Sequence, residues 1–264
     1  MPLFEFTLKD IADVELWGEE GQKNLHWFAL IDGFFTVNAG DRRLFALTPE
    51  MTALRGNANG KAAQACDVDY QVARLHTDML TILADALQPI PEDIFQYVED
   101  QKKQDDLYAK LDVCWESDDG SIVAPLAADW LDARKLDTEY LHDGPDIWFL
   151  NTGDHINVRW RTEGKEEQDV KVWAAGNGEI ELGANSFLEE VILFHQSLME
   201  QMAARIELIK KNGPPAGVFV DMALLEQEHF ERQGQLETAL ASKIVTNNWQ
   251  AVAGALARVW KIIV

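Results

Sequence analysis

The chain is poor in cysteine and in long apolar runs, and each shortage excludes a class of protein. Only two cysteines, Cys66 and Cys114, occur in 264 residues, and they form neither a CxxC pair nor a metal-ligand spacing. No stretch approaches the ~20 apolar residues that span a bilayer, and the N-terminus lacks the basic and apolar regions of a signal peptide. We therefore expect a protein of the reducing cytoplasm that does not enter a membrane.

Basic residues are also few. The chain has 23 Lys and Arg against 45 Asp and Glu, and its formal net charge of −22 repels nucleic-acid phosphates and anionic lipid headgroups. The excess is uneven, because residues 67–146 hold 20 acids and 6 bases whereas residues 201–264 hold 6 acids and 7 bases. Such a field disfavours a nucleic-acid ligand and can steer a basic protein partner. An acidic surface that only keeps the protein soluble accounts for the same composition.

Catalytic signatures are the third shortage. The chain has no GxSxG, HExxH or GxGxxG motif that follows a strand. Its nearest approach to a phosphate-binding loop, RGNANGKAA, is one residue short and carries Ala62 where Ser or Thr is needed, so this stretch is predicted to be a flexible connecting loop. The six histidines share no ligand-like spacing. We expect neither a cofactor nor a metal site, and the sequence names no catalytic residue.

Two parts of the chain carry the short, aromatic or β-branched runs that predict antiparallel strands. In the first, LFEFTL alternates apolar and polar side chains, LHWFALI (25–31) leads into a turn at Asp32-Gly33, and FFTVNA and GDRRLFALT follow. In the second, the short runs IWFLN, HINVRW, VKVWAA and EIEL are separated by Gly, Asn and Asp. Each part predicts a β-meander in which Trp-Phe (27–28 and 148–149) opens a hairpin with its two rings on opposite faces.

Amphipathic helices are predicted around these meanders. Apolar stripes predict one helix within residues 69–87 and another within 187–211, the latter started by a capping box of Ser186 and Glu189 and ended at Gly213. A helix is also predicted from Pro91 to Leu111. Residues 221–240 and 248–263 predict two more helices, which either cap the body or form a surface for homo-oligomerisation.

Together these elements predict an α+β fold, with antiparallel β-meanders each followed by a helix over residues 1–212 and a helical C-terminal segment over residues 213–264. The two meander-and-helix stretches align at offsets of 121 and 119 residues, which predicts related units 1–111 and 112–212 about a pseudo-twofold. Coincidence between two ordinary hairpins would give the same few matches. If the units pair, His76 and His195 face each other, either as a proton-transfer or metal site or as core residues. The aligned residues are Trp27, Phe28, Val37, Val72, His76 and Leu83 with Trp148, Phe149, Val158, Val191, His195 and Met202.

Acids in two neighbouring stretches are the best candidates for a surface that binds a basic partner. The stretches are QKKQDD and CWESDDGS, and the second is predicted to be an exposed acidic turn after a strand. It lacks the spacing of an EF-hand calcium loop. The predicted partner-binding residues are Asp105, Asp106, Glu116, Asp118 and Asp119.

Three stretches carry a likeness to a known family: ELWGEEGQKNLHWFALIDG, PDIWFLNTGDHINVRW and SFLEEVILFHQSLMEQMAARI. They resemble an uncharacterised bacterial family, a domain of unknown function, over about residues 1–211. LHWFALIDG, an LHWFxLxDG-type hairpin, is its most specific part. The family pattern has Pro before Trp17 and Thr at position 31, where this chain has Leu16 and Ile31. The resemblance implies a bacterial cytosolic protein with one defined fold, and it supplies no reaction.

Two functions follow as hypotheses. The first is a non-enzymatic acidic binding protein that neutralises a basic partner protein, in the manner of a bacterial immunity protein or antitoxin. The alternative is a small-molecule hydrolase whose acids and histidines meet only in the folded chain, because active sites converge from distant loops. A deep pocket that holds His76 or His195 with a carboxylate would favour the hydrolase.

Overall fold

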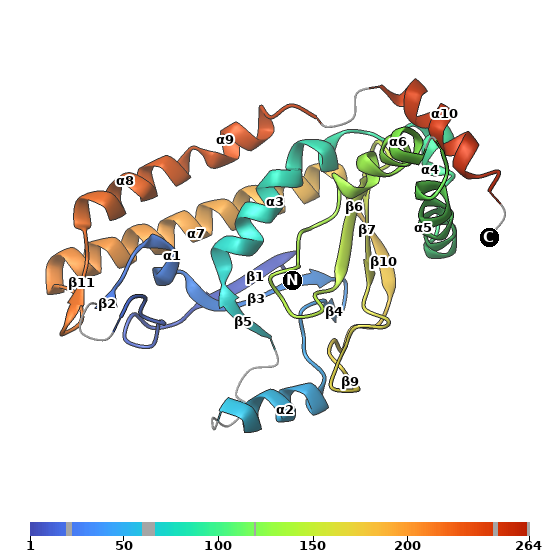
Figure 1. The fold of residues 1–264 in the computed structure, drawn as a ribbon. Helices are drawn as coiled ribbons and strands as arrows, with labels where there is room; N and C mark the ends of the chain where they lie inside the picture. The colour runs from blue at the N-terminus through green and yellow to red at the C-terminus, as the bar shows by residue number, and fades with distance from the viewer. Residues whose placement is uncertain (20–22, 60–66, 119, 245–247, 263–264) are drawn as a thin grey trace.

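The fold is described from a computed structural model that defines residues 1–264 except 20–22, 60–66, 119, 245–247 and 263–264 (Figure 1). The chain combines helices with several antiparallel sheets and ends in a run of helices, so the predicted α+β class and the helical C-terminal region are confirmed. The helices are α1 (Trp27–Leu30), α2 (Pro49–Asn59), α3 (Val72–Leu87), α4 (Glu92–Phe95), α5 (Gln101–Trp115), α6 (Gly120–Asp132), α7 (Ala184–Asn212), α8 (Met222–Gln233), α9 (Gln235–Leu240) and α10 (Trp249–Val259). The strands are β1 (Phe4–Leu8), β2 (Lys23–Asn24), β3 (Asp32–Ala39), β4 (Arg42–Arg43), β5 (Val68–Gln71), β6 (Asp146–Asn151), β7 (His155–Arg161), β8 (Glu166–Glu167), β9 (Val170–Lys171), β10 (Gly178–Gly183) and β11 (Val218–Phe219).

The first sheet has the order β1-β3-β4, with β5 also paired to β3, and all of its pairs are antiparallel. β3 is its central strand and is almost wholly buried. Gly33 lies in β3 between Leu8 of β1 and Tyr70 of β5. A Cβ atom at Gly33 would stand 2.4 Å from the carbonyl oxygen of Thr7, so only glycine allows β1 to approach β3 this closely.

The prediction of a strand at residues 25–31 is wrong. Trp27–Leu30 forms one helical turn, α1, and the Nδ1 atom of His26 accepts a hydrogen bond from the Ala29 amide at 3.3 Å as its N-cap. Asp32 and Gly33 consequently begin β3 instead of forming a hairpin turn. A short apolar run is too short for its periodicity to distinguish a buried strand from a single helical turn. Here the N-cap hydrogen bond of His26 favours the helical turn.

The second sheet has the order β10-β7-β6 and is also antiparallel. β6 and β7 are buried, and the rings of Trp148 and Phe149 lie in two different hydrophobic cores. The two rings of this Trp-Phe pair were predicted to lie on opposite faces of the sheet. Successive side chains along a strand point to opposite faces, which explains why the adjacent rings enter different cores. β6 therefore stands between the two cores.

α3 directly follows β5, and α7 directly follows β10, as the apolar stripes predict. The capping box predicted for α7 is wrong, because the helix begins at Ala184 and Ser186 already lies inside its first turn. Gly213, with a φ of 76°, ends α7 as predicted.

The single helix predicted from Pro91 to Leu111 is wrong. Two helices replace it, because Asp100 interrupts the helical run as an N-cap whose side chain accepts a hydrogen bond from the Lys103 amide at 2.8 Å. α6 packs against α5, and the acidic turn at residues 116–118 therefore follows a helix and not the strand that was expected. The RGNANGKAA stretch, expected as a loop, begins inside α2, and residues 60–66 lie outside the described part of the chain.

The C-terminal segment packs on the rest of the chain at two places. α8 lies on α7, and α9 lies on α3, whereas α10 crosses α6 and α4 at the other end (Figure 1). α10 buries Val252, Leu256 and Val259 in the core that also holds Trp130 and Trp148. No helix in the described part of the chain is long and apolar enough to cross a membrane. The two-unit division and its pseudo-twofold remain predictions.

Candidate functional site

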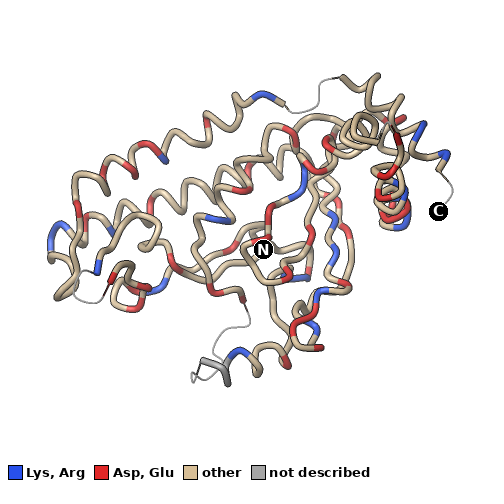
Figure 2. The backbone as a smooth tube through the Cα atoms, viewed as in Figure 1, with Lys and Arg blue, Asp and Glu red and all other residues tan. Residues whose placement is uncertain are grey.

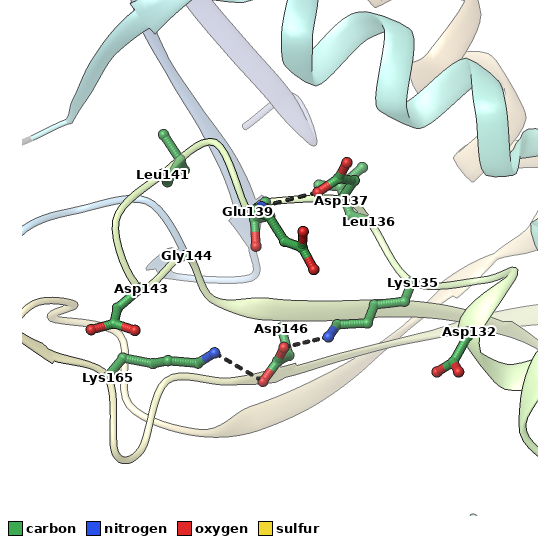
Figure 3. A pocket seen from close by; sticks show the side chains of 11 residues that line it. Asp132, Lys135, Leu136, Asp137, Glu139, Leu141, Asp143, Gly144, Asp146 and Lys165 are labelled. Atoms are coloured by element: carbon green, nitrogen blue, oxygen red, sulfur yellow. Dashed lines mark hydrogen bonds and ion pairs between the residues drawn. The ribbon is translucent and has the colours of Figure 1, made fainter.

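A cavity of about 660 Å³ lies where the chain passes from α6 to β6 (Figure 3). Most of its lining comes from residues 133–145, here called the pocket connection, which is the irregular segment between these two elements. Five of the lining residues are acids and two are lysines, so we call the cavity the acidic pocket. It is lined by Asp132, Lys135, Leu136, Asp137, Thr138, Glu139, Leu141, Asp143, Gly144, Asp146 and Lys165.

The pocket connection is held in place by hydrogen bonds at both ends. The Leu136 amide donates to the Ile147 carbonyl at 2.8 Å, and the Thr138 hydroxyl donates to the Pro145 carbonyl at 2.9 Å. Gly144 packs so closely on Thr138 that a Cβ atom would stand 2.3 Å from the Thr138 carbonyl oxygen. The connection is therefore shaped before any ligand arrives, which reduces the entropy lost on binding.

Asp146, the first residue of β6, forms the inner wall of the acidic pocket. The Lys135 Nζ lies 2.6 Å from one of its carboxylate oxygens, and the Lys165 Nζ lies 3.4 Å from the other (Figure 3). The Arg161 Nη2 lies 3.3 Å from that second oxygen. Burial alone would raise the pKa of Asp146, but Lys135, Lys165 and Arg161 outweigh it and hold that pKa below its usual value. Lys135 and Arg161 also lie over the ring of Trp148, with centroid distances of 5.5 and 5.7 Å. Both lysines that line the pocket therefore form ion pairs with Asp146.

The remaining four carboxylates of the acidic pocket face solvent. Asp132, Asp137, Glu139 and Asp143 are exposed, and none forms an ion pair with Lys or Arg in the described part of the chain. Asp132 accepts a hydrogen bond from the Tyr108 hydroxyl at 3.0 Å. The buried residues Leu136 and Leu141 also line the pocket. The acidic pocket therefore combines uncompensated negative charge with an apolar surface.

None of the sequence-predicted partner-binding residues that the structure describes lines the acidic pocket. Asp105 lies 2.9 Å from Arg161, which also contacts Asp146, and Asp106 lies 2.6 Å from Lys102. Acids and bases alternate along α5 in this way (Figure 2). Glu116 and Asp118 are exposed in the turn after α5, and Asp119 lies outside the described residues. Of this set, only Asp105 is linked to the pocket wall.

Sequence reasoning missed the pocket residues themselves. Residues 127–146 contain six acids and two bases, and 13 of these residues form an irregular connection. A long connection that carries charge is a signal for function that the sequence does show. The contribution of Lys165 and Arg161 has no such signal, because Arg161 reaches Asp146 only through the pairing of β7 with β6, and Lys165 follows β7.

His76 and His195 do face each other, as the pairing of the two helices predicts. The Nε2 atom of His76 lies 2.9 Å from the Nδ1 atom of His195, whose Nε2 atom lies 3.2 Å from the Gln233 carbonyl oxygen. Burial, with the neighbouring His195 and Arg232, lowers the pKa of His76 to about 3. Neither histidine lines the acidic pocket, and the part of the chain that is described contains no group of three His, Cys, Asp or Glu able to hold a metal ion.

Comparison with known proteins assigns the chain to a family. The family of unknown function DUF5984 matches residues 3–255. The match passes well beyond residue 211, where the likeness seen in the sequence ended, so α8, α9 and most of α10 belong to the family pattern. No curated protein and no solved structure matches the chain. The chain therefore belongs to the family of unknown function DUF5984.

Proposed function

We propose that the protein is a non-enzymatic binding protein and that its acidic pocket receives a cationic group of a basic partner protein. The observation that carries the proposal is the set of four exposed carboxylates, three on a connection fixed by hydrogen bonds and one at the end of α6, that have no Lys or Arg partner in the described part of the chain. Cationic groups satisfy such carboxylates best, because opposite charge recovers part of the hydration lost on contact.

The lining of the pocket suits a long basic side chain. Lys and Arg carry an apolar stem below a charged head, and stems of this kind pack on apolar surface while the head remains polar. Leu141 offers a small part of that surface and Leu136 is fully buried behind the lining, whereas Asp137, Glu139 and Asp143 supply negative charge. The net charge of −22 adds long-range attraction that would speed association at low salt.

An immunity-like or antitoxin-like role is the concrete form of this proposal. The charge of the chain supports it, because a neutralising partner of a basic nuclease must compete with the nuclease's own anionic substrate. A basic toxin encoded beside the gene would be a supporting observation.

The hydrolase alternative receives less support from the geometry. It requires a general base within reach of a cavity, usually with a carboxylate that orients it. Among the described residues, His76 and His195 hydrogen-bond each other and a backbone carbonyl but no carboxylate. The one buried carboxylate of the acidic pocket, Asp146, is already held by three cations.

The proposal is tested with a fluorescent peptide of alternating Arg and Gly, capped at both ends, here called the Arg peptide. Its affinity is measured by fluorescence anisotropy at about 0.02 M and about 0.3 M salt, since screening weakens contacts between exposed charges. Wild type is compared with Asp137→Asn/Glu139→Gln. The matched control is Glu92→Gln/Asp93→Asn, which removes the same charge from exposed positions on α4.

The pocket variant should bind the Arg peptide about tenfold more weakly at low salt, because two partly shielded charge contacts of roughly 0.7 kcal/mol each are lost. The control should change affinity by less than about threefold, since only the general field is altered. Equal losses in the two variants would show that net charge, and not the pocket, binds the peptide.

A further inference from the structure

Residues 222–240, which form α8 and α9, lie along α7 and α3 with little apolar surface to hold them there (Figure 1). Within this segment only Leu225 and Ala239 are buried apolar residues. Elements with few buried apolar contacts open locally at a lower free energy than the rest of a fold. The polar contacts of α8 and α9 therefore decide much of their attachment.

Three histidines, here called the histidine cluster, make the buried polar contacts of this segment. On α8, the Nδ1 atom of His229 accepts a hydrogen bond from the Trp27 indole of α1 at 3.4 Å. On α7, His195 donates from its Nε2 atom to the carbonyl oxygen of Gln233, the last residue of α8, at 3.2 Å. The other ring nitrogen of His195, Nδ1, lies 2.9 Å from the Nε2 atom of His76 on α3. The cluster therefore connects α8 to α1, α3 and α7.

The partners of these rings fix which nitrogen carries the proton. A carbonyl oxygen only accepts, so His195 is protonated at Nε2 and its Nδ1 atom is an acceptor. His76 consequently donates from Nε2, and its buried Nδ1 atom is left as an acceptor without a partner in the described part of the chain. An indole N–H only donates, so the Nδ1 atom of His229 is unprotonated and its Nε2 atom carries the proton. All three rings are neutral in this arrangement.

The side chain of Gln233 agrees with this assignment. Its amide lies 3.3 Å from the Nε2 atom of His229. The oxygen and nitrogen of an amide occupy interchangeable positions, so the amide oxygen accepts the proton of His229.

An additional proton has no favourable place in the histidine cluster. On His229 it would occupy Nδ1 and face the N–H of Trp27. On His195 it would also occupy Nδ1 and face the N–H of His76, unless His76 moved its own proton to an Nδ1 atom that has no acceptor among the described residues. A buried N–H without an acceptor is costly, and more so beside a positive charge. Proton uptake therefore opposes the contacts that attach α8.

The charged groups around the histidine cluster come from α8 itself. The Arg232 guanidinium lies 4.0 Å from the centroid of the Trp27 ring, and its charge helps to lower the pKa of His76. Glu228 lies 2.8 Å from Arg232 and opposes the lowering of the pKa of His26, the neighbour of Trp27. Apart from the histidines, no charged group of α3, α7 or α9 is among the causes of the shifts in the cluster. Burial lowers the pKa of all three rings, which agrees with the neutral arrangement.

We propose that the histidine cluster is a pH-sensitive latch, which releases residues 222–240 from α1, α3 and α7 in mild acid while the two larger sheets stay folded. None of the three histidines lines the acidic pocket, so the inference is independent of the proposed function. A histidine whose pKa is lowered in the closed state favours opening as the pH falls through its ordinary value of about 6.5. Between about pH 7.5 and pH 5.5 each such histidine raises the opening equilibrium by up to about tenfold, so His195 and His229 together raise it by up to about a hundredfold.

Hydrogen exchange of the full chain, followed by mass spectrometry at about pH 7.5 and about pH 5.5, tests the latch. Exchange rates are divided by the intrinsic rates at each pH to give protection factors. The protection of residues 222–240 should fall by about ten- to a hundredfold at the lower pH and should stay below the protection of β7 at both. A change of less than about threefold would overturn the inference. Equal protection of this segment and of β7 at both pH values would also overturn it, because the segment would then open only with the whole fold.

His229→Gln separates the cluster from a general effect of acid. Glutamine stays neutral and offers an amide oxygen to the Trp27 indole, so the fall in protection of residues 222–240 should become up to about tenfold smaller than in wild type. His155→Gln, the same replacement at an exposed position of β7, is the matched control and should behave as wild type. A fall in His229→Gln as large as in wild type would overturn the inference.

Nitrogen NMR of the wild-type imidazoles covers a variant that fails to fold. At about pH 7.5 the shifts of His76, His195 and His229 should show neutral rings protonated at Nε2. A charged His195 or His229 in protein whose residues 222–240 remain protected would overturn the inference.

Discussion

Mild acid should destabilise the protein through the histidine pair that joins α3 to α7. The perturbation is a change from about pH 7.5 to about pH 5. His76 has a pKa of about 3 in the folded chain against 6.5 for an ordinary histidine, so the unfolded chain binds a proton below pH 6.5 that the folded chain refuses. Stability is therefore lost as the pH falls from 6.5 toward 3. Each unit in this window costs about 1.4 kcal/mol, which gives a loss of about 2 kcal/mol at about pH 5 from His76 alone.

The free energy of unfolding is measured by urea denaturation, followed by the fluorescence of the nine tryptophans. The same measurement on His76→Leu removes the titrating group, and the stability of that variant should fall by about 2 kcal/mol less over the same pH range. At the higher pH this variant should be less stable by about 1–3 kcal/mol, because the Nδ1 atom of His195 loses its buried partner. His142→Asn, at an exposed position, is the control. An acid-induced loss in His76→Leu as large as in wild type would refute the reasoning.

Three further substitutions test contacts that hold the fold and the pocket. Asp146→Ala leaves two lysines and an arginine without their shared carboxylate and should lower the free energy of unfolding by about 3 kcal/mol in urea denaturation. Gly33→Ala places a methyl group 2.4 Å from the Thr7 carbonyl oxygen, so thermal unfolding should show a loss of at least about 2 kcal/mol. Leu256→Ala empties a fully buried site on α10 and should cost about 3 kcal/mol in a single unfolding transition; an unchanged midpoint would show that α10 is not part of the folded core.

Much of the fold could be predicted where periodicity was long. The apolar stripes of α3 and α7 extend over several helical turns. Turn residues separate the runs that form β6, β7 and β10, so the tertiary packing agrees with the local sequence pattern. The prediction failed where one side chain decides a short element. His26 caps the single turn of α1, and Asp100 divides the helical run from residue 91 to residue 115. Each cap depends on one side chain and therefore leaves no periodic pattern in the sequence.

The candidate site was predictable only in part. The stretch with the excess of acids, residues 67–146, includes most of the residues that line the acidic pocket, and Asp105 reaches the wall of the pocket through Arg161. The carboxylates of this region differ in whether a Lys or Arg side chain lies close enough to form an ion pair. Asp106 is paired along its own helix, whereas Glu139 and Asp137 have no Lys or Arg partner in the described structure. That difference depends on which side chains are neighbours in the folded chain, and a count of charges along the sequence does not reveal this.

The most direct test of the central claim is an NMR titration of the isotope-labelled protein with the Arg peptide at low salt. If the acidic pocket receives the cationic group, the largest amide shift changes should fall on the pocket connection, including Thr138, Leu141 and Gly144, and should saturate with the affinity found by anisotropy. Shift changes confined to α5 and its C-terminal turn, around Asp106 and Glu116, or spread evenly over the acidic surface, would contradict the account.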